Sequence, residues 1–251
     1  MSLSAEERRS ILERARLAEE AGRWDDMVTY MKALVVKGRD LSVEERNMFA
    51  NAYKNYVGQK RASWRVVSGI EQKIGSSNRR RDLSREYRTK IEEELKVCCN
   101  EVLSLIEQHL LNTIDTENRI FYLKMQGDYF RYLSEFSRDT ISDGVFERAK
   151  VAYATAFEQA KENLSPAHPL RLGLILNFSV FHHEILESHE TGCEMAREAV
   201  AAAADETNSL PESMRNDSTL IIQLMKDNIK IWSVEIESQN QLQKTTTVRY
   251  H

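Results

Sequence analysis

Apolar residues recur along most of the chain at alternating intervals of three and four, which places them on one face of an α-helix. Three Ser-x-x-Glu pairs, which begin at Ser4, Ser42 and Ser209, have the spacing of a capping box and mark helix starts. The pattern therefore predicts an all-α fold of nine antiparallel helices. Their expected ranges are 4–21, 25–38, 42–74, 80–111, 117–137, 143–163, 169–187, 191–207 and 212–234.

The breaks between these helices are short. A Gly-Ser-Ser-Asn run at 75–78 separates the third helix from the fourth, and Pro169 has the position of a first-turn proline. Because no break is long enough for a domain linker, we expect one domain over residues 1–235. Stacked antiparallel pairs like those of tetratricopeptide proteins fit the short joins, although no fixed repeat period is visible. The apolar spacing fades near the end, which predicts a flexible tail over 236–251.

The composition favours helices, since 9 Gly and 3 Pro among 251 residues supply few of the turns that a strand-rich fold needs. No apolar run approaches the ~20 residues that cross a bilayer, and the N-terminus has no apolar signal segment, so we expect neither export nor membrane insertion. The three cysteines include adjacent Cys98 and Cys99 and lack metal-ligand spacing. We therefore expect a cytoplasmic protein, with the nucleus as a further location, and no metal or other cofactor.

The charge balance limits the kinds of ligand. A net charge of −4 and a pI near 6.0 argue against nucleic-acid binding, which needs a surplus of Lys and Arg on one face. Any anion site must be local. In the third predicted helix, Lys54 and Arg61 lie on nearly the same face, and Arg65 continues the stripe. Taken alone, these three residues are more typical of a solvated charged face.

The fifth predicted helix changes this weighing. Lys124, Asp128 and Arg131 follow one another at intervals of four and three, so they share a face on which Asp128 can orient both cations. The adjacent Tyr132 adds a neutral hydroxyl donor. If this helix faces the basic stripe, a compact ammonium, a planar guanidinium fork and a directed hydroxyl can converge on one phosphoryl dianion.

Two later helices carry an asparagine within an aliphatic run. Asn177 shares a helix face with Val180 and Glu184, and Asn228 follows Leu224 by four residues. A buried amide is costly unless it is paired, and its donor and acceptor suit the backbone of an extended peptide. Two structural asparagines with internal partners are the alternative.

Several of these stretches strongly resemble the 14-3-3 family, in order and over residues ~4 to ~234. The resemblance rests on 53–55, 57–58 and Arg61, on 122–125, 127–129 and 131–132, and on 171–174, 176–181 and 217–221. It implies a cup-shaped dimer with one peptide groove in each subunit. By position, the phosphate-binding residues are Lys54, Arg61, Arg131 and Tyr132. The implied peptide-binding residues are the backbone clamps Asn177 and Asn228, Lys124, the groove supports Glu184 and Trp232, and the apolar wall of Leu176, Val180, Leu220, Ile221 and Leu224.

The resemblance also implies a dimer interface, in which an apolar contact dominates and exposed ion pairs set the register. Ser63 matches an interface serine that is phosphorylated in some members, and its added charge would oppose dimerisation. The apolar contact places Leu17, Ala18 and Ala21 against Val67, Ile70 and Tyr87 of the other subunit, and the implied ion pairs are Arg23 with Glu94 and Asp26 with Lys90.

The chain departs from the family pattern in a few places. His182 and His183 replace a pair that is aromatic in many members, Gly69 stands where Ser is usual, and Lys60 where Arg is common. Histidines on the helix surface, or with internal partners, are the favoured interpretation, and a pH-sensitive element is the alternative. The tail lacks the acidic run common in the family.

The function predicted from these observations is a phosphoserine- or phosphothreonine-dependent adaptor that clamps segments of phosphorylated proteins and forms homodimers or heterodimers. A phosphate-independent helical interaction scaffold is the alternative. We find no Gly-rich phosphate loop, metal-ligand spacing or nucleophile-base signature, so we expect no enzyme.

Overall fold

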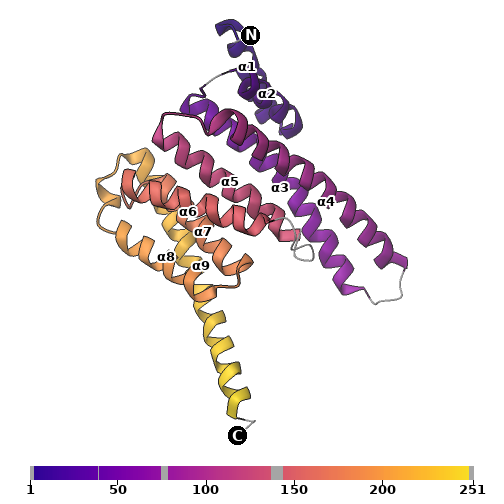
Figure 1. Ribbon diagram of the computed structural model, residues 1–251, viewed down its shortest axis with the longest axis vertical. Coiled ribbons are helices and arrows are strands. Elements are labelled where there is room, and N and C mark those ends of the chain that lie inside the picture. Colours follow the sequence, from indigo (N-terminus) through magenta and orange to yellow (C-terminus); the bar gives the residue numbers. More distant parts are fainter. Residues whose placement is uncertain (1–2, 39, 75–78, 137–143, 249–251) are drawn as a thin grey trace. The chain divides into compact units, whose positions relative to one another are not determined.

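The computed structural model describes residues 3–38, 40–74, 79–136 and 144–248, with side chains up to residue 239 (Figure 1). Within these ranges the chain forms the nine predicted α-helices and no strand. The break expected at 75–78 lies outside them, as do residues 137 and 143 that bound two predicted helices. The α-helices are α1 (Ala5–Glu20), α2 (Trp24–Lys37), α3 (Val43–Lys73), α4 (Arg79–Leu105), α5 (Thr116–Phe136), α6 (Val145–Asn163), α7 (Pro169–Val180), α8 (His189–Ala203) and α9 (Glu212–Val248).

The capping pattern is confirmed for α1 and α3. The Ser4 hydroxyl accepts from the backbone N–H of Glu7 at 3.2 Å, and the Glu7 carboxylate accepts from the Ser4 N–H at 2.8 Å. Ser42 and Glu45 repeat this arrangement at the start of α3. These reciprocal bonds satisfy N–H groups that a helix leaves unpaired at its first turn.

The third expected capping box is wrong. Ser209 ends a short 3₁₀ helix, η4 (Thr207–Ser209), and its hydroxyl donates to the carbonyl of Glu206 at 2.7 Å. Leu210 is extended, as a residue before proline prefers, so the helix cannot start there. α9 starts at Glu212, where the prediction placed it, and the carbonyl of Pro211 accepts from the N–H of Arg215 at 2.9 Å.

Three of these helices, α4, α7 and α9, end differently from the prediction. α4 passes into a π-helical turn, η1 (Ile106–Leu110), and α7 into another, η3 (Phe181–Ile185). α9 continues to Val248, beyond the predicted end at 234, because no Gly or Pro interrupts residues 212–248. Its C-terminal part, yellow in Figure 1, extends past the other helices of its unit. The flexibility predicted for 236–251 stays a prediction.

The chain divides into two compact units. The first unit comprises residues 1–114 and 136–141, and the second comprises 115–135 and 142–251. The single domain expected over 1–235 stays a prediction. No described helix is both long enough and apolar enough to cross a membrane.

In the first unit, α1 packs on α2, α2 on α3, and α3 on α4. Its core is filled by fully buried side chains that include Met27, Leu34 and Leu95. Phe49 and Tyr53 lie one turn apart on α3 with their ring centres 5.0 Å apart in an edge-to-face contact. The buried Tyr53 hydroxyl donates to Glu101 at 2.8 Å, which fixes α3 against α4.

In the second unit, α7 packs against α6, α8 and α9. Leu172 and Ile175 of α7 meet Met225 of α9 in one apolar cluster. A second cluster joins Cys193 of α8 to Trp232 of α9. α7 begins as predicted with Pro169 in its first turn. The packing leaves one face of α7 beside α5 and α9, where the candidate site lies.

Candidate functional site

A polar cluster lies on α5 at the positions predicted from its sequence. The ammonium Nζ of Lys124 donates to Oδ2 of Asp128 at 2.8 Å, and Nη2 of Arg131 lies 3.9 Å from Oδ1 of the same carboxylate. Asp128 is 7% exposed and Arg131 8%, so these charges are largely withdrawn from water. One buried carboxylate therefore holds both cations of the helix face.

Two further helices donate to the same carboxylate. The Tyr153 hydroxyl of α6 donates to Oδ1 of Asp128 at 2.5 Å, and Nδ2 of Asn177 of α7 donates to Oδ1 at 2.7 Å. Asp128 thus joins α5, α6 and α7. Asn177, the predicted backbone clamp, therefore has an internal partner, as the structural interpretation expects. This bond uses one N–H of the amide and does not exclude a second role in ligand binding.

Tyr153 is a member of this cluster that the sequence interpretation missed. Its ring is fully buried and lies against α5 at Gly127, where an added Cβ would come within 2.6 Å of the tyrosine ring. A glycine inside a helical pattern is the signal that could have indicated the close approach of a large side chain. The ring also stacks on Phe178 of α7, with centres 5.3 Å apart and planes inclined by 23°.

Arg131 is fixed on several sides. Its Nε donates to the Tyr153 hydroxyl at 3.2 Å, and Nη1 lies 3.5 Å from the carboxylate of Glu135. The guanidinium carbon lies 4.8 Å from the ring centre of Tyr132, which is half-buried. The guanidinium is therefore held at a defined orientation, as recognition of a planar or tetrahedral anion requires.

The charges of the cluster shift one another's pKa values. Burial alone would raise the pKa of Asp128, but the positive charges of Lys124 and Arg131 outweigh it and lower the pKa below its usual range. Burial opposes the charge of Arg131, yet its tyrosine neighbours and Asp128 raise its pKa. Burial and Asp128 raise the pKa of Tyr153, so its hydroxyl stays protonated as a donor. All three groups keep their usual neutral-pH forms.

The predicted apolar wall lies next to this cluster. A Cβ added at Gly173 of α7 would lie 3.8 Å from Cε of Lys124 and 3.9 Å from Cδ1 of Ile221. Lys124 of α5 and Ile221 of α9 therefore both lie close to α7 at this glycine. Leu220 and Leu224 of α9 are 63% and 46% exposed. The half-buried members of the wall are Leu176, Val180 and Ile221, and Asn228 is half-buried one turn after Leu224.

The sequence is similar to those of known proteins over most of its length. A family model for the 14-3-3 protein matches residues 14–233. The chain belongs to the 14-3-3 family. The 14-3-3 protein beta/alpha of Mus musculus is 48% identical over 226 residues, which cover 90% of this chain and 92% of that protein. The 14-3-3 protein zeta of Bombyx mori is 46% identical over 238 residues, covering 94% and 95%. The family resemblance stated from the sequence is confirmed, and membership supports a protein-binding adaptor role in signalling.

The two groove supports expected for a 14-3-3 chain lie in different environments. Glu184 is exposed in the π-helical turn η3. Trp232 is 5% exposed and packs in the apolar cluster with Cys193 and Ala196. Trp232 thus supports the α9 wall from inside the unit.

The histidine pair of this 14-3-3 chain lies deeper than surface residues do, and one nitrogen of each ring has no hydrogen bond among the described residues. His183 is 6% exposed and stacks on Trp232, and His182 is half-buried. Nδ1 of His182 and Nε2 of His183 have no hydrogen-bond partner in the described part of the chain. Nε2 of His183 lies 3.4 Å from the Glu235 carboxylate, without the alignment of a hydrogen bond.

The basic stripe belongs to the first unit. Lys54 is exposed and Arg61 is half-buried, and on α3 they stand two turns apart, about 10 Å along the helix axis. Arg131 and Tyr132 belong to the second unit. Convergence of these four residues on one phosphate stays a prediction from the sequence.

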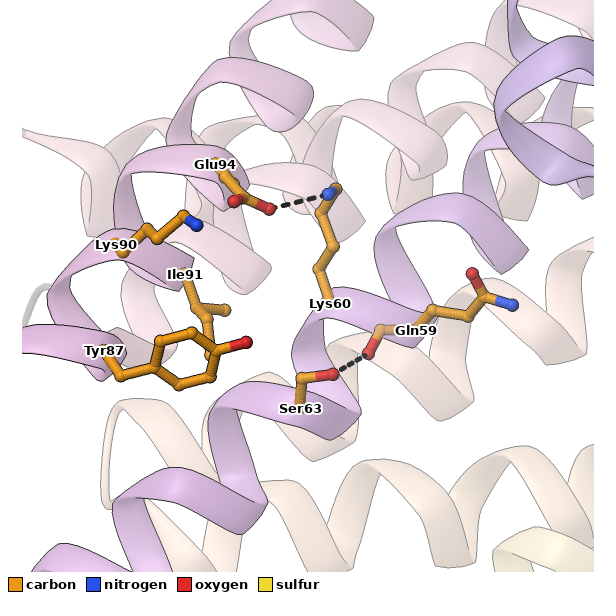
Figure 2. Close-up of a pocket in the computed structure, with 7 residues that line it drawn as sticks. All are labelled: Gln59, Lys60, Ser63, Tyr87, Lys90, Ile91 and Glu94. Atoms are coloured by element: carbon orange, nitrogen blue, oxygen red, sulfur yellow. Dashed lines mark hydrogen bonds and ion pairs between the residues drawn. The ribbon is translucent and has the colours of Figure 1, made fainter. Parts of the chain in front are cut away.

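The face expected to form the 14-3-3 dimer carries a pocket of about 240 Å³ between α3 and α4 (Figure 2). Lys60 donates to Glu94 across it at 2.8 Å, and the Ser63 hydroxyl donates to the carbonyl of Gln59 at 3.1 Å. Four of the residues expected at the dimer contact line this pocket. Its lining consists of Gln59, Lys60, Ser63, Tyr87, Lys90, Ile91 and Glu94.

The other residues of the predicted interface are placed in different ways. Leu17 is 58% exposed and Ala21 is exposed, whereas Ala18 is buried inside the unit. Val67 and Ile70 are half-buried on α3. The predicted intermolecular ion pairs have intramolecular competitors, because Arg23 pairs with Asp26 and Glu94 with Lys60, and Lys90 lies over the Tyr87 ring.

Within the described residues, no three His, Cys, Asp or Glu side chains are grouped so that they could hold a metal ion. Cys98, Cys99 and Cys193 are buried, and none of them forms a disulfide.

Proposed function

We propose that this 14-3-3 chain is a phosphoserine- and phosphothreonine-dependent adaptor that binds extended segments of phosphorylated proteins and so regulates their signalling, location or activity. The observation that carries the proposal is the Asp128-centred cluster, which presents a lysine, an oriented arginine and an asparagine beside an exposed apolar wall. Such a combination of a cationic end and an apolar wall suits an anionic side chain on an extended backbone.

The charge balance of the cluster is the reason for assigning further cations to the phosphate. In the cluster, the charges of Lys124 and Arg131 are matched by Asp128 and Glu135, so the second unit alone supplies no net positive charge there. A phosphoryl group carries about −1.5 to −2 near neutral pH. We therefore assign Lys54 and Arg61 as the additional cations, with Arg131 providing a fork and Tyr132 a hydroxyl donor.

The peptide backbone is assigned to the two asparagines. Nδ2 of Asn177 donates to Asp128, and we assign its amide oxygen to accept from a backbone N–H of the ligand. Asn228 would hold the following part of the backbone from α9. Leu220 and Leu224, which are open to solvent, would contact apolar ligand side chains and exclude water from the polar bonds.

Dimerisation is the second part of the proposal. The exposed Leu17 of one subunit would enter the face that carries the α3–α4 pocket of the other, in a homodimer or a heterodimer with related chains. Two linked grooves would raise the apparent affinity for doubly phosphorylated proteins by ~10² to 10⁴ where the spacer reaches both. We place this activity in the cytoplasm and the nucleus, without nucleic acid or a cofactor.

The test is a titration with peptides selected from a degenerate library that has one fixed central phosphoserine, each compared with its unphosphorylated twin. The wild type should bind the phosphorylated form at least ~10-fold more tightly, since hydrogen bonds to charged groups each contribute about 1.5–3 kcal/mol. Lys54→Glu and Arg61→Ala should remove this preference, whereas Lys96→Glu on the exposed side of α4 should keep it.

The competing function is a phosphate-independent helical scaffold. It predicts equal affinity for both members of each peptide pair and no effect of Arg61→Ala. That result in the wild type would reject the proposal.

A further inference from the structure

The Tyr153 hydroxyl lies between the two opposite charges of the α5 cluster. It has one proton, which it donates to Oδ1 of Asp128 at 2.5 Å, and its lone pairs accept from Nε of Arg131 at 3.2 Å. The chain of bonds therefore runs from the guanidinium through the phenol to the carboxylate. No other side chain bonded to Asp128 also bonds to Nε of Arg131 among the described contacts.

The position of this hydroxyl is set by packing on three helices. The Tyr153 ring is fully buried, fills the space that Gly127 leaves on α5, and stacks on Phe178 of α7. It also lies 5.6 Å, centre to centre, from the ring of Phe181. Because the ring cannot turn without displacing these neighbours, its hydroxyl is a fixed point against which Arg131 is aligned.

The bond to Nε determines which edge of the guanidinium remains for a ligand. An arginine can grip an anion side-on through Nε and one terminal nitrogen, or end-on through both terminal nitrogens. With Nε occupied by Tyr153, the end-on edge remains. Its internal contacts are long, at 3.5 Å from Nη1 to Glu135 and 3.9 Å from Nη2 to Asp128.

We propose that Tyr153 is a positioning residue of the phosphate site, whose hydroxyl holds the Nε edge of Arg131 so that both terminal nitrogens face the phosphoryl group. This inference rests on the proposed function. The proposed role of Tyr153 also includes Asn177, the residue assigned to the peptide backbone. Tyr153 and Asn177 donate to the same oxygen of Asp128, so loss of the tyrosine hydroxyl would change the surroundings of the asparagine. Tyr153 contacts no ligand itself and acts through its two charged neighbours.

The test variant is Tyr153→Phe, which keeps the ring in its space and removes the hydroxyl alone. Tyr53→Phe is the matched control, because Tyr53 is also fully buried and donates to a carboxylate, in the first unit. We expect Tyr153→Phe to weaken binding of the selected phosphoserine peptide about tenfold, as for a lost hydrogen bond to a charged group, with the unphosphorylated twin unaffected. Tyr53→Phe should leave the phosphopeptide affinity within about twofold of the wild type.

A double-mutant cycle separates positioning from mere structural support. In an Arg131→Lys background, which has no Nε, removal of the Tyr153 hydroxyl should weaken phosphopeptide binding less than twofold, whereas a loss equal to that in the wild-type background would overturn the inference. If the wild type itself fails to prefer the phosphopeptide, the proposed function fails. If it does prefer it and Tyr153→Phe binds equally well, only the role of Tyr153 fails.

A measurement without any peptide tests the geometry in the unaltered protein. The NMR signal of the Arg131 Nε–H should exchange slowly with water, and it should move and exchange faster in Tyr153→Phe. Exchange in the wild type as fast as for exposed arginines would overturn the inference, even if Tyr153→Phe does not fold.

Discussion

The imidazole of His183 lies flat on the indole of Trp232, with ring centres 4.4 Å apart and planes inclined by 13°. This contact joins the π-helical turn η3 to α9, the helix that carries Leu220, Ile221 and Leu224 of the proposed apolar wall. The groups that face His183 are His189 of α8 at 4.5 Å between ring centres and Glu235 of α9 at 3.4 Å. The neighbouring His182 interacts electrostatically with Lys150 of α6.

The first prediction is that acid weakens the fold. Burial, and then the charge of His189, lower the pKa of His183 below its ordinary value of 6.5, while Glu235 opposes them in part. Burial and then Lys150 likewise lower the pKa of His182. A histidine whose pKa is lower in the folded chain contributes stability above the unfolded pKa, and this is lost as pH falls through the folded pKa. The melting temperature should therefore fall between about pH 7.5 and 5.5.

The variant for this prediction replaces the pair by aromatic residues, His182→Phe with His183→Tyr. Its melting temperature should change less between the two pH values than that of the wild type. His109→Gln, an exposed histidine in the first unit, is the control and should behave as the wild type. An equal pH dependence in all three proteins would contradict the assignment.

The second prediction concerns the charge of Asp128. Asp128→Asn keeps the shape but places an amide against the donors of Lys124, Tyr153 and Asn177. The free energy of unfolding should fall by about 3 kcal/mol, as for a broken buried ion pair, and phosphopeptide binding should be lost. Chemical denaturation and a peptide titration measure these effects. Glu158→Gln, on the exposed side of α6, should change neither by more than about 0.5 kcal/mol.

The pH dependence separates Asp128 from the histidines. Its folded pKa lies below the ordinary value of 3.8, so its contribution is complete above the unfolded pKa and is lost only as pH falls below it. The loss of stability in Asp128→Asn should accordingly be the same at pH 7.5 and 5.5. A loss that disappears at the lower pH would mean that Asp128 already binds a proton there.

The third prediction uses the close approach of two helices. Gly127→Ala would bring a Cβ to 2.6 Å from the buried Tyr153 ring, which has no room to retreat, and should lower the free energy of unfolding by about 1–3 kcal/mol. Gly69→Ala on α3 meets no atom within 4 Å and should raise it by about 0.5–1 kcal/mol through helix propensity. Denaturant titration of both variants provides the comparison. Similar changes of one sign would show that packing at Gly127 is unimportant.

The fourth prediction concerns assembly. Leu17→Glu places a charge on the exposed apolar position of α1 and should weaken a dimer at least ~10-fold, because an unpaired charge resists burial. Ser63→Glu, at the α3–α4 pocket, should act in the same direction. Sedimentation velocity over a concentration series measures the shift toward monomer. Val97→Glu, at a position 68% exposed on α4, is the control, and an equal effect there would reject the assigned interface.

The sequence predicted the helices well because their apolar spacing is regular, and it predicted the contacts of Lys124 and Arg131 with Asp128 because spacings of three and four on one helix determine them. It did not predict Tyr153. In a run such as Val151-Ala152-Tyr153 a tyrosine looks like any core residue, and the partner of its hydroxyl lies on another helix.

The errors at helix ends have local causes. The π turns η1 and η3 follow α4 and α7 without a break and are a single turn each, so the apolar periodicity could not separate them from the α-helices. Ser209 does not cap α9, because it ends η4 and Pro211 follows two residues later, although its capping spacing is ideal. The burial of the histidine pair was not predicted, because sequence spacing does not reveal the depth at which a residue lies.

The hydrogen bonds to Asp128 order the side chains of the site when the chain folds, and not when a ligand binds. Lys124, Asn177 and Tyr153 lose their rotational freedom when α5, α6 and α7 assemble, before any ligand arrives, so little ordering of these side chains remains to oppose binding. Substitutions that loosen the three helices, even far from the groove, should then appear in calorimetry as a less favourable binding entropy. Residues that no ligand ever contacts can in this way set the affinity.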